Sequence, residues 1–161
     1  MKTLTQQLMH ELFDYRNGNL YRKVSTNCRL KIGSKVGSID KKGYVHTSIY
    51  GKPYLVHRII FLMEYGYLPH DVDHKDKNPS NNHIDNLRPA TRTQNQYNGT
   101  RKRAKNNLKH VYWTPRLNKW VVRINISGKM RHIGVFNNLE LADLVAQEAR
   151  AKYHKEFACH E

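Results

Sequence analysis

The 161-residue chain has few cysteines, few acidic side chains and no long hydrophobic run. Two cysteines, Cys28 and Cys159, are too few for a cysteine-rich zinc module or a disulfide scaffold, and they indicate a reducing compartment. The most apolar segment, residues 55–63, is interrupted by His57 and Arg58 and is too short to span a bilayer. The amino terminus lacks the apolar stretch of a secretory signal. We therefore expect a cytoplasmic protein with no membrane partner.

Positive charge is what the chain has in excess. It carries 28 Lys and Arg against 13 Asp and Glu, a formal net charge of +15, with a pI near 9.9. Such a balance indicates a polyanionic partner, for which nucleic acid is the first candidate; an anionic membrane surface, the second, is disfavoured by the lack of a long apolar segment. The excess is spread along the chain, because residues 1–98 carry net +7 and residues 99–161 carry net +8. Both parts are expected to touch the polyanion.

Hydrophobic periodicity predicts small elements in the first 70 residues. Leucines at helical spacing predict a helix over residues 1–12, and Asn17-Gly18 between two short segments predicts a β-hairpin. Alternation predicts a strand over residues 44–49, followed by a turn at residues 51–53. A change to helical period predicts a helix over residues 56–65, with Val56, Ile59, Ile60 and Met63 on its buried face and Gly66 at its end.

The last third of the chain predicts a separate unit of three strands and one helix. Asn138 is placed to cap a helix that runs to about Tyr153. Its expected apolar face is Leu141, Leu144, Val145, Ala149 and Tyr153. The expected core of this unit is Trp113, Trp120, Val122, Ile124, Ile133 and Phe136. The predicted organisation is α+β, with a first domain at residues 1–98, a basic linker at 99–109 and a second domain at 110–161.

Residues 72–98 (VDHKDKNPSNNHIDNLRPATRTQNQYN) concentrate side chains that handle metal ions and water. The pattern predicts a strand at 71–74, a loop at 75–82, an extended piece at 84–88 and a helix from about residue 92. Asp73 and Asn95 offer oxygen ligands that suit a hard cation such as Mg²⁺, and His74 can act as general base. Successive strand residues point to opposite faces, so Asp73 and His74 can share a site only where the strand ends.

This segment resembles the HNH (ββα-metal) endonuclease motif, most closely that of phage and intron-encoded homing endonucleases. The resemblance implies a DNA endonuclease that uses one divalent ion, Mg²⁺ or Mn²⁺, on double-stranded DNA in a bacterial host's cytoplasm. By position, His74 matches the general base, Asn86 the central Asn that braces the loop and helps orient that base, and Asp73 and Asn95 the metal ligands. Asn98, one helical turn further on, stays open as an alternative ligand. Lys77 stands where a Gly is more usual.

The C-terminal segment from His110 is similar to the AP2/ERF DNA-binding domain, in which a three-stranded sheet backed by one helix presents its outer face to the major groove. Trp120, Val122 and Ile124 would face the helix, with Val121 on the other side. Arg123 and Asn125 are suited to bidentate contacts with base edges. The expected DNA-binding residues of the whole chain are Arg58, Lys75, Lys77, Arg88, Arg101, Arg103, Tyr112, Arg116, Arg123, Asn125 and His132.

Other readings of these residues stay open. Asp76 is expected to cap the loop, His83 to face solvent or a phosphate, and His57 and Arg58 to decorate a helix or touch phosphate. As a whole, the chain could instead be a DNA-binding transcriptional regulator with an inactive nuclease centre, or a packaging protein. The sequence leaves open whether it is a monomer or a homodimer and whether it nicks or cuts both strands.

Overall fold

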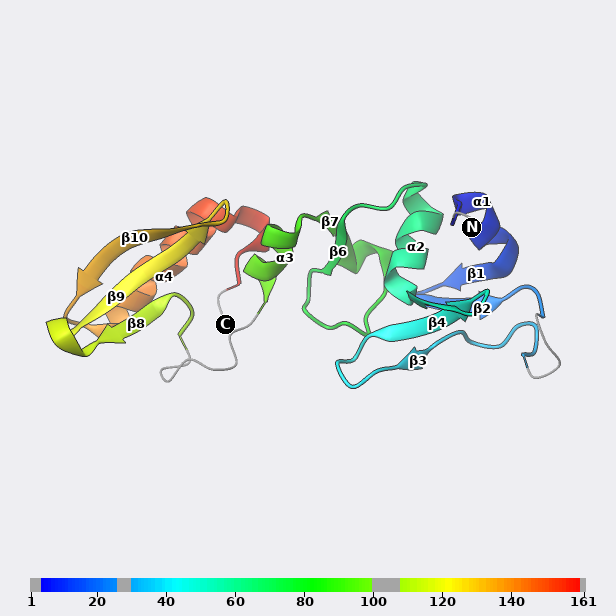
Figure 1. Ribbon diagram of the computed structural model, residues 1–161, viewed down its shortest axis with the longest axis horizontal. Helices are drawn as coiled ribbons and strands as arrows, with labels where there is room; N and C mark the ends of the chain where they lie inside the picture. Colours follow the sequence, from blue (N-terminus) through cyan, green and yellow to red (C-terminus); the bar gives the residue numbers. More distant parts are fainter. Residues whose placement is uncertain (1–3, 26–29, 100–107, 160–161) are drawn as a thin grey trace. The chain divides into compact units, whose positions relative to one another are not determined.

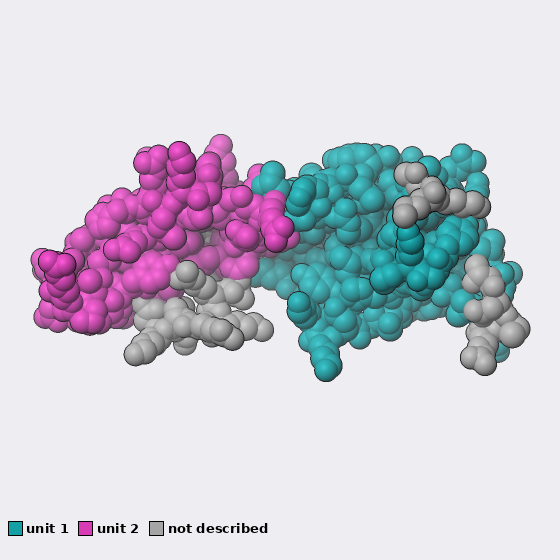
Figure 2. All heavy atoms as spheres, viewed as in Figure 1, with its two compact units in different colours: residues 1–91 teal, residues 92–161 magenta. Residues whose placement is uncertain are grey.

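The computed structural model describes residues 4–25, 30–99 and 108–159. Contacts divide the chain into two compact units, residues 1–91 and residues 92–161 (Figure 2). Both units contain helices and small antiparallel sheets, so the expected α+β class holds. The division falls before the helix at residues 92–98, which the sequence had grouped with the first domain. None of the described helices is long and apolar enough to cross a membrane.

Unit 1 consists of short strands arranged around one central helix (Figure 1). Three antiparallel sheets form, β1–β2, β3–β4–β5 and β6–β7. The elements in chain order are α1 (Gln6–Leu12), β1 (Phe13–Arg16), β2 (Asn19–Arg22), β3 (Ser38–Ile39), β4 (Val45–Ile49), β5 (Lys52–Leu55), α2 (Val56–Tyr65), β6 (Asp71–His74), the 3₁₀ turn η1 (Ile84–Asn86) and β7 (Leu87–Ala90).

The turns of unit 1 form at residues that adopt positive φ angles. Asn17 and Gly18 both have positive φ, 44° and 78°, and close the predicted β1–β2 hairpin. Gly66 ends α2 in the left-handed conformation, φ 76°, as predicted. The turn expected at residues 51–53 lies one residue earlier, at Tyr50 and Gly51, with φ 50° and 77°. Residues 52 and 53 instead begin β5, which pairs with β4.

The core of unit 1 surrounds α2. The predicted face is buried, but His57, Phe61 and Leu62 are buried too, at 3%, 1% and 4% exposure. The reason is that α2 contacts α1, β4, β5, β6 and η1, so almost no side of the helix faces solvent. Periodicity marks one apolar stripe, whereas tertiary packing encloses the helix nearly all round.

Unit 2 is a three-stranded antiparallel sheet with one long helix on one face (Figure 1). The strand order is β10–β9–β8, and Asn138 caps the helix as predicted, accepting from the amides of Glu140 and Leu141. Its elements are α3 (Arg92–Asn98), β8 (Val111–Thr114), η2 (Pro115–Leu117), β9 (Lys119–Ile126), β10 (Lys129–Phe136), α4 (Leu139–His154) and η3 (Lys155–Phe157).

The predicted apolar face of α4 is wrong in part. Leu141 and Leu144 are 49% and 54% exposed and Tyr153 is 42% exposed, whereas Ala149 is buried as expected. Ala142 and Ala146 join Ala149 against the sheet. Small side chains let a helix approach a small sheet closely, so a stripe of alanines decides the packing and leaves the larger leucines outside.

Two expectations about the sheet of unit 2 are also corrected. Trp113, in the four-residue strand β8, is 43% exposed and lies next to Trp120. Val121, predicted to point outward, is only 2% exposed although it lies on the face opposite Val122. It is the third residue of the central strand β9, and it is paired on either side with Tyr112 and Val135. Neighbouring strands therefore cover it.

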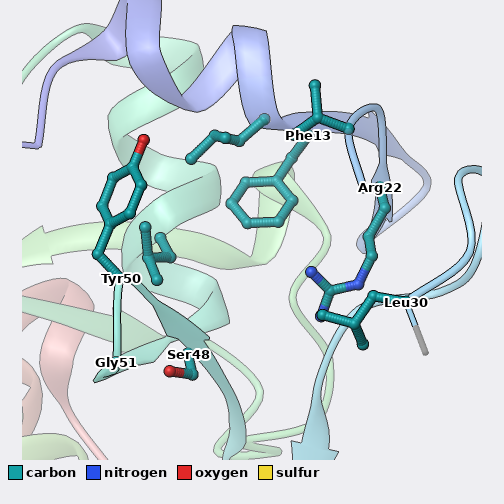
Figure 3. A pocket seen from close by; sticks show the side chains of 9 residues that line it. Phe13, Arg22, Leu30, Ser48, Tyr50 and Gly51 are labelled. Atoms are coloured by element: carbon teal, nitrogen blue, oxygen red, sulfur yellow. The ribbon is translucent and has the colours of Figure 1, made fainter. Parts of the chain in front are cut away.

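Unit 1 contains a cavity of about 450 Å³ near the β1–β2 hairpin. Figure 3 shows Phe13 and Arg22 at its wall, with Tyr50 from the β4–β5 turn at the other side. None of its lining residues belongs to the segment at residues 72–98. The candidate site is therefore built elsewhere in unit 1.

Candidate active site

The strand pair β6–β7 carries the two central side chains of the site. Asp73 and His74 end β6, and both are 5% exposed. In the antiparallel register Asp73 lies opposite Arg88, and His74 lies opposite Leu87. The strand ends at His74, which is where the sequence required it to end if both side chains were to serve one site.

Asp73 is held by a buried ion pair. The Nε and Nη2 atoms of Arg88 both lie 2.8 Å from one carboxylate oxygen of Asp73, Oδ2. The Arg88 side chain is 10% exposed and that of Asp73 is 5% exposed. Arg88, predicted to hold DNA phosphate, thus neutralises the charge of the predicted metal ligand beside it.

His74 is oriented by a residue that the sequence analysis did not single out. Its Nε2 lies 3.0 Å from Oδ1 of Asn82, which is 2% exposed. An amide oxygen only accepts hydrogen bonds, so Nε2 carries the proton and Nδ1 carries the lone pair of the neutral ring. No local pattern marks Asn82, because the path of the loop brings it back to His74 eight residues later.

Asn86 braces the loop between β6 and β7. Its amide nitrogen donates to Asp76 Oδ1 at 2.9 Å and to the carbonyl of Asn81 at 2.8 Å, and its Oδ1 accepts from the Asp76 amide at 3.0 Å. Asp76 also accepts from Asn78 and Asn81, so it organises the loop as expected. Burial raises the pKa of Asp76, but these hydrogen bonds outweigh burial and leave it below its ordinary value.

Two other turns of unit 1 hold the loop in place. Ser80 donates to the carbonyl of Gly43 at 2.7 Å. Gly43 has φ +88°, and a β-carbon there would lie 2.8 Å from Cγ of Pro79. On the other side, Gly18 lies against the backbone at His83, and the Tyr15 hydroxyl accepts from the amide of Ile84 at 3.0 Å. The β1–β2 hairpin and the turn before β4 thus act as supports for the motif.

His57 is a second buried histidine at this site. The sequence placed it on a helix surface, but its ring lies 4.8 Å from the His74 ring in an edge-to-face arrangement. Tyr44 lies 5.8 Å from His57 and 6.2 Å from His74, measured between ring centres. Burial, together with the charges of His74, Arg58 and His46, lowers the pKa of His57 to about 3. His57 is therefore neutral at physiological pH.

Predicted phosphate-binding residues of unit 1 also make internal contacts. Arg58 donates to the carbonyls of His70 and Pro69, at 3.0 and 3.3 Å. Lys75 is exposed and donates to the carbonyl of Asp85 at 2.7 Å. Lys77 adopts φ 63°, the left-handed conformation that explains why a glycine is more usual at this position. His83 is half-buried and lies 3.4 Å from Asp85. Their contacts with DNA stay predictions.

Asn95 and Asn98 lie on α3, in unit 2. Asn95 is half-buried and Asn98 is 5% exposed. Tyr97 fixes α3 within unit 2, because its ring stacks on His154 at 3.6 Å and its hydroxyl accepts from the Ser127 amide at 2.9 Å. The role of Asn95 beside Asp73, and the choice between Asn95 and Asn98, therefore stay predictions.

The outer face of the unit 2 sheet carries the other predicted DNA-binding side chains. The strand register places Arg123 opposite His132, and both are exposed. Asn125 and Tyr112 are half-buried on the same face, and Arg116 is exposed in η2. Arg101 and Arg103, predicted in the linker, lie outside the described residues.

The donor chemistry suits a hard cation with oxygen ligands. Asp73 offers a carboxylate, which has about four acceptor positions. Within the described part of the chain, no group of three or more His, Cys, Asp or Glu side chains is placed to hold a metal ion.

Comparison with known proteins points to the same segment. Residues 54–97, from β5 through α3, match the HNH endonuclease family. The chain is also 32% identical to Protein 3.8 of Escherichia phage T7 over 90 residues, which is 54% of this chain and 72% of that protein. No solved structure matches the chain. The family match ends before the sheet of unit 2, whose resemblance to the AP2/ERF domain stays a prediction.

Proposed function

Since this chain belongs to the family of Protein 3.8 of Escherichia phage T7 and carries an HNH endonuclease domain at residues 54–97, we propose that it is a divalent-metal-dependent endonuclease for double-stranded DNA. One observation carries the proposal. A buried His74, fixed in one tautomer by Asn82, stands at the end of the strand that bears a buried carboxylate, Asp73. The expected compartment is the cytoplasm of a bacterial host.

His74 acts as the general base in this proposal. Its Nδ1 lone pair accepts a proton from the attacking water, and the hydroxide oxygen bonds to phosphorus as the bond to the leaving sugar oxygen breaks. The hydrogen bond from Nε2 to Asn82 keeps the proton off Nδ1 and helps to stabilise the imidazolium that forms. Asn86 contributes indirectly by holding the loop that carries Asn82.

Asp73 and Asn95 are the proposed ligands of one Mg²⁺ or Mn²⁺ ion, with Asn98 as the alternative to Asn95. Such an ion, when bound, stabilises negative charge on the scissile phosphate and the leaving oxygen. Arg88 holds the Asp73 carboxylate in a fixed orientation through a hydrogen bond from Nε and an ion-pair contact from Nη2. The protein therefore supplies a preorganised carboxylate to the ion.

In this proposal, unit 2 and the net positive charge of the chain provide the affinity for DNA and the selectivity for a cleavage site. The outer sheet face presents Arg123 and His132 to solvent, and the chain carries net +15. An AP2-like mode of binding, in which this face enters the major groove, would let Arg123 contact base edges. The Oδ1 atom of Asn125 is buried and would have to become exposed before Asn125 could do the same. A homing-type endonuclease needs such recognition, because cleavage at one site requires discrimination from many others.

The test is cleavage of supercoiled plasmid with Mg²⁺ or Mn²⁺. We expect wild-type protein to convert it to nicked or linear DNA, and EDTA and His74→Ala to abolish conversion. His10→Ala is the matched control, since His10 bonds to the Met63 carbonyl near the far end of α2 from His57. One His74 per chain cuts one strand per visit, so nicking should precede linearisation. Unchanged supercoiled DNA at every wild-type concentration would refute the nuclease.

The Asp73–Arg88 pair also supports a second candidate, a DNA-binding regulator with an inactive centre. A carboxylate that is already neutralised attracts a cation less strongly than a lone carboxylate does. This candidate predicts sequence-selective DNA binding by the wild-type protein with no metal-dependent cleavage. A band-shift assay on the plasmid fragments, run beside the cleavage assay, separates the two.

A further inference from the structure

Buried His57 has no role in the proposed chemistry, yet it lies against the residue that does. It belongs to the first turn of α2, far from His74 in sequence, and it is 3% exposed. The two ring centres are 4.8 Å apart with an interplanar angle of 70°. Tyr44 contacts both rings, so the His74 imidazole sits beside two other planar rings.

Core packing alone does not account for a histidine at this position. Neighbouring α2 residues Ile59, Ile60 and Phe61 fill the same core with apolar side chains. The Nδ1 atom of His57 is buried and has no hydrogen-bond partner among the described residues. Burying an imidazole nitrogen without a partner costs free energy that a leucine or phenylalanine would not. A histidine here therefore calls for an explanation other than filling space.

An uncharged His57 is suited to a position next to a general base. Its lowered pKa, caused first by burial, keeps the ring uncharged. When His74 takes up a proton, it then meets no second cation at 4.8 Å. A neutral ring with a π face, unlike an aliphatic side chain, also attracts the imidazolium.

We infer that His57 is a positioning residue for His74, which, together with Tyr44 and Asn82, holds the His74 ring in the orientation that proton transfer requires. This inference rests on the proposed nuclease function. Asn82 fixes one ring nitrogen through a hydrogen bond, while the rings of His57 and Tyr44 limit rotation of the imidazole about its Cβ–Cγ bond. His57 itself touches neither water nor phosphate in this role.

The kinetic test uses three variants of full-length protein. We expect His57→Ala to lower kcat for plasmid nicking by about tenfold to a hundredfold, the usual effect of a slightly misplaced catalytic group, with KM for DNA changed less than about twofold. His57→Phe, which keeps a ring, should restore kcat to within about threefold of wild type, whereas His57→Leu, of similar bulk, should not. His10→Ala should behave as wild type.

Some results would overturn the inference. Equal kcat for the Phe and Leu variants, or a loss of kcat that follows the folded fraction measured by circular dichroism, would mean that His57 only fills space. Full activity of His57→Ala would mean that it does nothing for His74. If the Ala variant does not fold, the comparison of Phe with Leu still decides.

A second readout keeps the inference testable if wild-type protein cleaves no DNA. Long-range ¹H–¹⁵N correlation spectra report the tautomer of each histidine, and His74→Gln identifies the signals of His74. We expect a single tautomer protonated at Nε2 in wild type and in His57→Phe, and mixed tautomers in His57→Ala and His57→Leu. An unchanged His74 signal in the Ala variant would refute positioning by His57, whatever the outcome of the cleavage assay.

Discussion

Arg88 donates to one oxygen of Asp73 through two nitrogens, each at 2.8 Å, across paired strands β6 and β7. Because both side chains are buried, the pair cannot be treated as a surface salt bridge. Removing one partner of a buried pair leaves the other charge uncompensated and costs roughly 3–5 kcal/mol. Arg88 is therefore tied to the stability of the fold as well as to any contact with DNA.

We expect Arg88→Ala to lower the free energy of unfolding by about 3–5 kcal/mol in urea denaturation. Arg88→Lys should lose less, because it keeps the charge but not the planar fork. Lys75 serves as the comparison with buried Arg88, because it is a basic residue that is exposed. Lys75→Ala should leave stability nearly unchanged and reduce the slope of log binding constant against log salt by about 1. An Arg88→Ala variant as stable as wild type would contradict the structural role of the ion pair.

Asn82 and Asn86 are expected to act differently. Asn82→Ala leaves the loop bonds of Asn86 in place and removes the partner of His74 Nε2, so kcat should fall by about a hundredfold with KM nearly unchanged. Asn86→Ala removes three hydrogen bonds of the loop and should also increase amide exchange at residues 76–82. Plasmid kinetics and hydrogen exchange measure the two effects. Faster exchange in Asn82→Ala than in Asn86→Ala would contradict this assignment.

Stability should fall on acidification because of His57. In the folded state the pKa of His57 is about 3, below its ordinary value of 6.5 in the unfolded chain. Between these values the unfolded state binds a proton that the folded state does not, so the free energy of unfolding decreases by up to about 1.4 kcal/mol for each pH unit below 6.5. The charged groups acting on His57 are His74, Arg58 and His46.

Urea denaturation between pH 7 and pH 4.5 measures this dependence. His57→Phe should reduce the slope of the free energy of unfolding against pH, by up to the uptake of one proton. The reason is that the substitution removes a group that titrates in this range only in the unfolded state. His10→Ala provides the control for loss of a histidine that is not deeply buried. Identical slopes in wild type and His57→Phe would show that His57 is not held neutral by burial.

Gly43 should be less replaceable than Gly51. Both have positive φ, +88° and +77°, so alanine is strained at each by roughly 1–2 kcal/mol. At Gly51 a β-carbon meets nothing within 4 Å, whereas at Gly43 it would lie 2.8 Å from Pro79. We expect Gly43→Ala to be the more destabilising by about 1–3 kcal/mol and to lower kcat, since the motif loop must shift. Equal melting temperatures for the two variants would contradict the close contact.

In unit 2 the outer sheet face, not the helix, is expected to bind DNA. Arg123→Ala should weaken binding to a preferred sequence by about 1–3 kcal/mol if Arg123 contacts a base. Lys152 on α4 is the matched control, since it is also exposed and carries the same charge. Lys152→Ala should change affinity little at physiological salt. A larger loss for Lys152→Ala in fluorescence anisotropy would place the DNA on the helix side.

Much of the framework could be predicted from local chemistry. Asn17-Gly18 adopts the positive φ values of a tight hairpin, Gly66 caps α2 and Asn138 caps α4, because each depends on residues within one turn of the chain. The ends of β6 and the start of α3 were also predicted from the motif. By contrast, the apolar face of α4 was not, because alanines at the sheet override the preference of the leucines for burial.

The amino-acid sequence by itself determined the charge, the order of the elements and the position of the segment that matches the HNH endonuclease family, residues 54–97. Those features depend on composition and on short-range spacing. Only tertiary structure placed Asn82 on His74, Arg88 on Asp73 and His57 in the core. These contacts join residues 8, 15 and 17 positions apart. A loop path, a strand register and the packing of a helix decide them, and no local periodicity encodes any of the three.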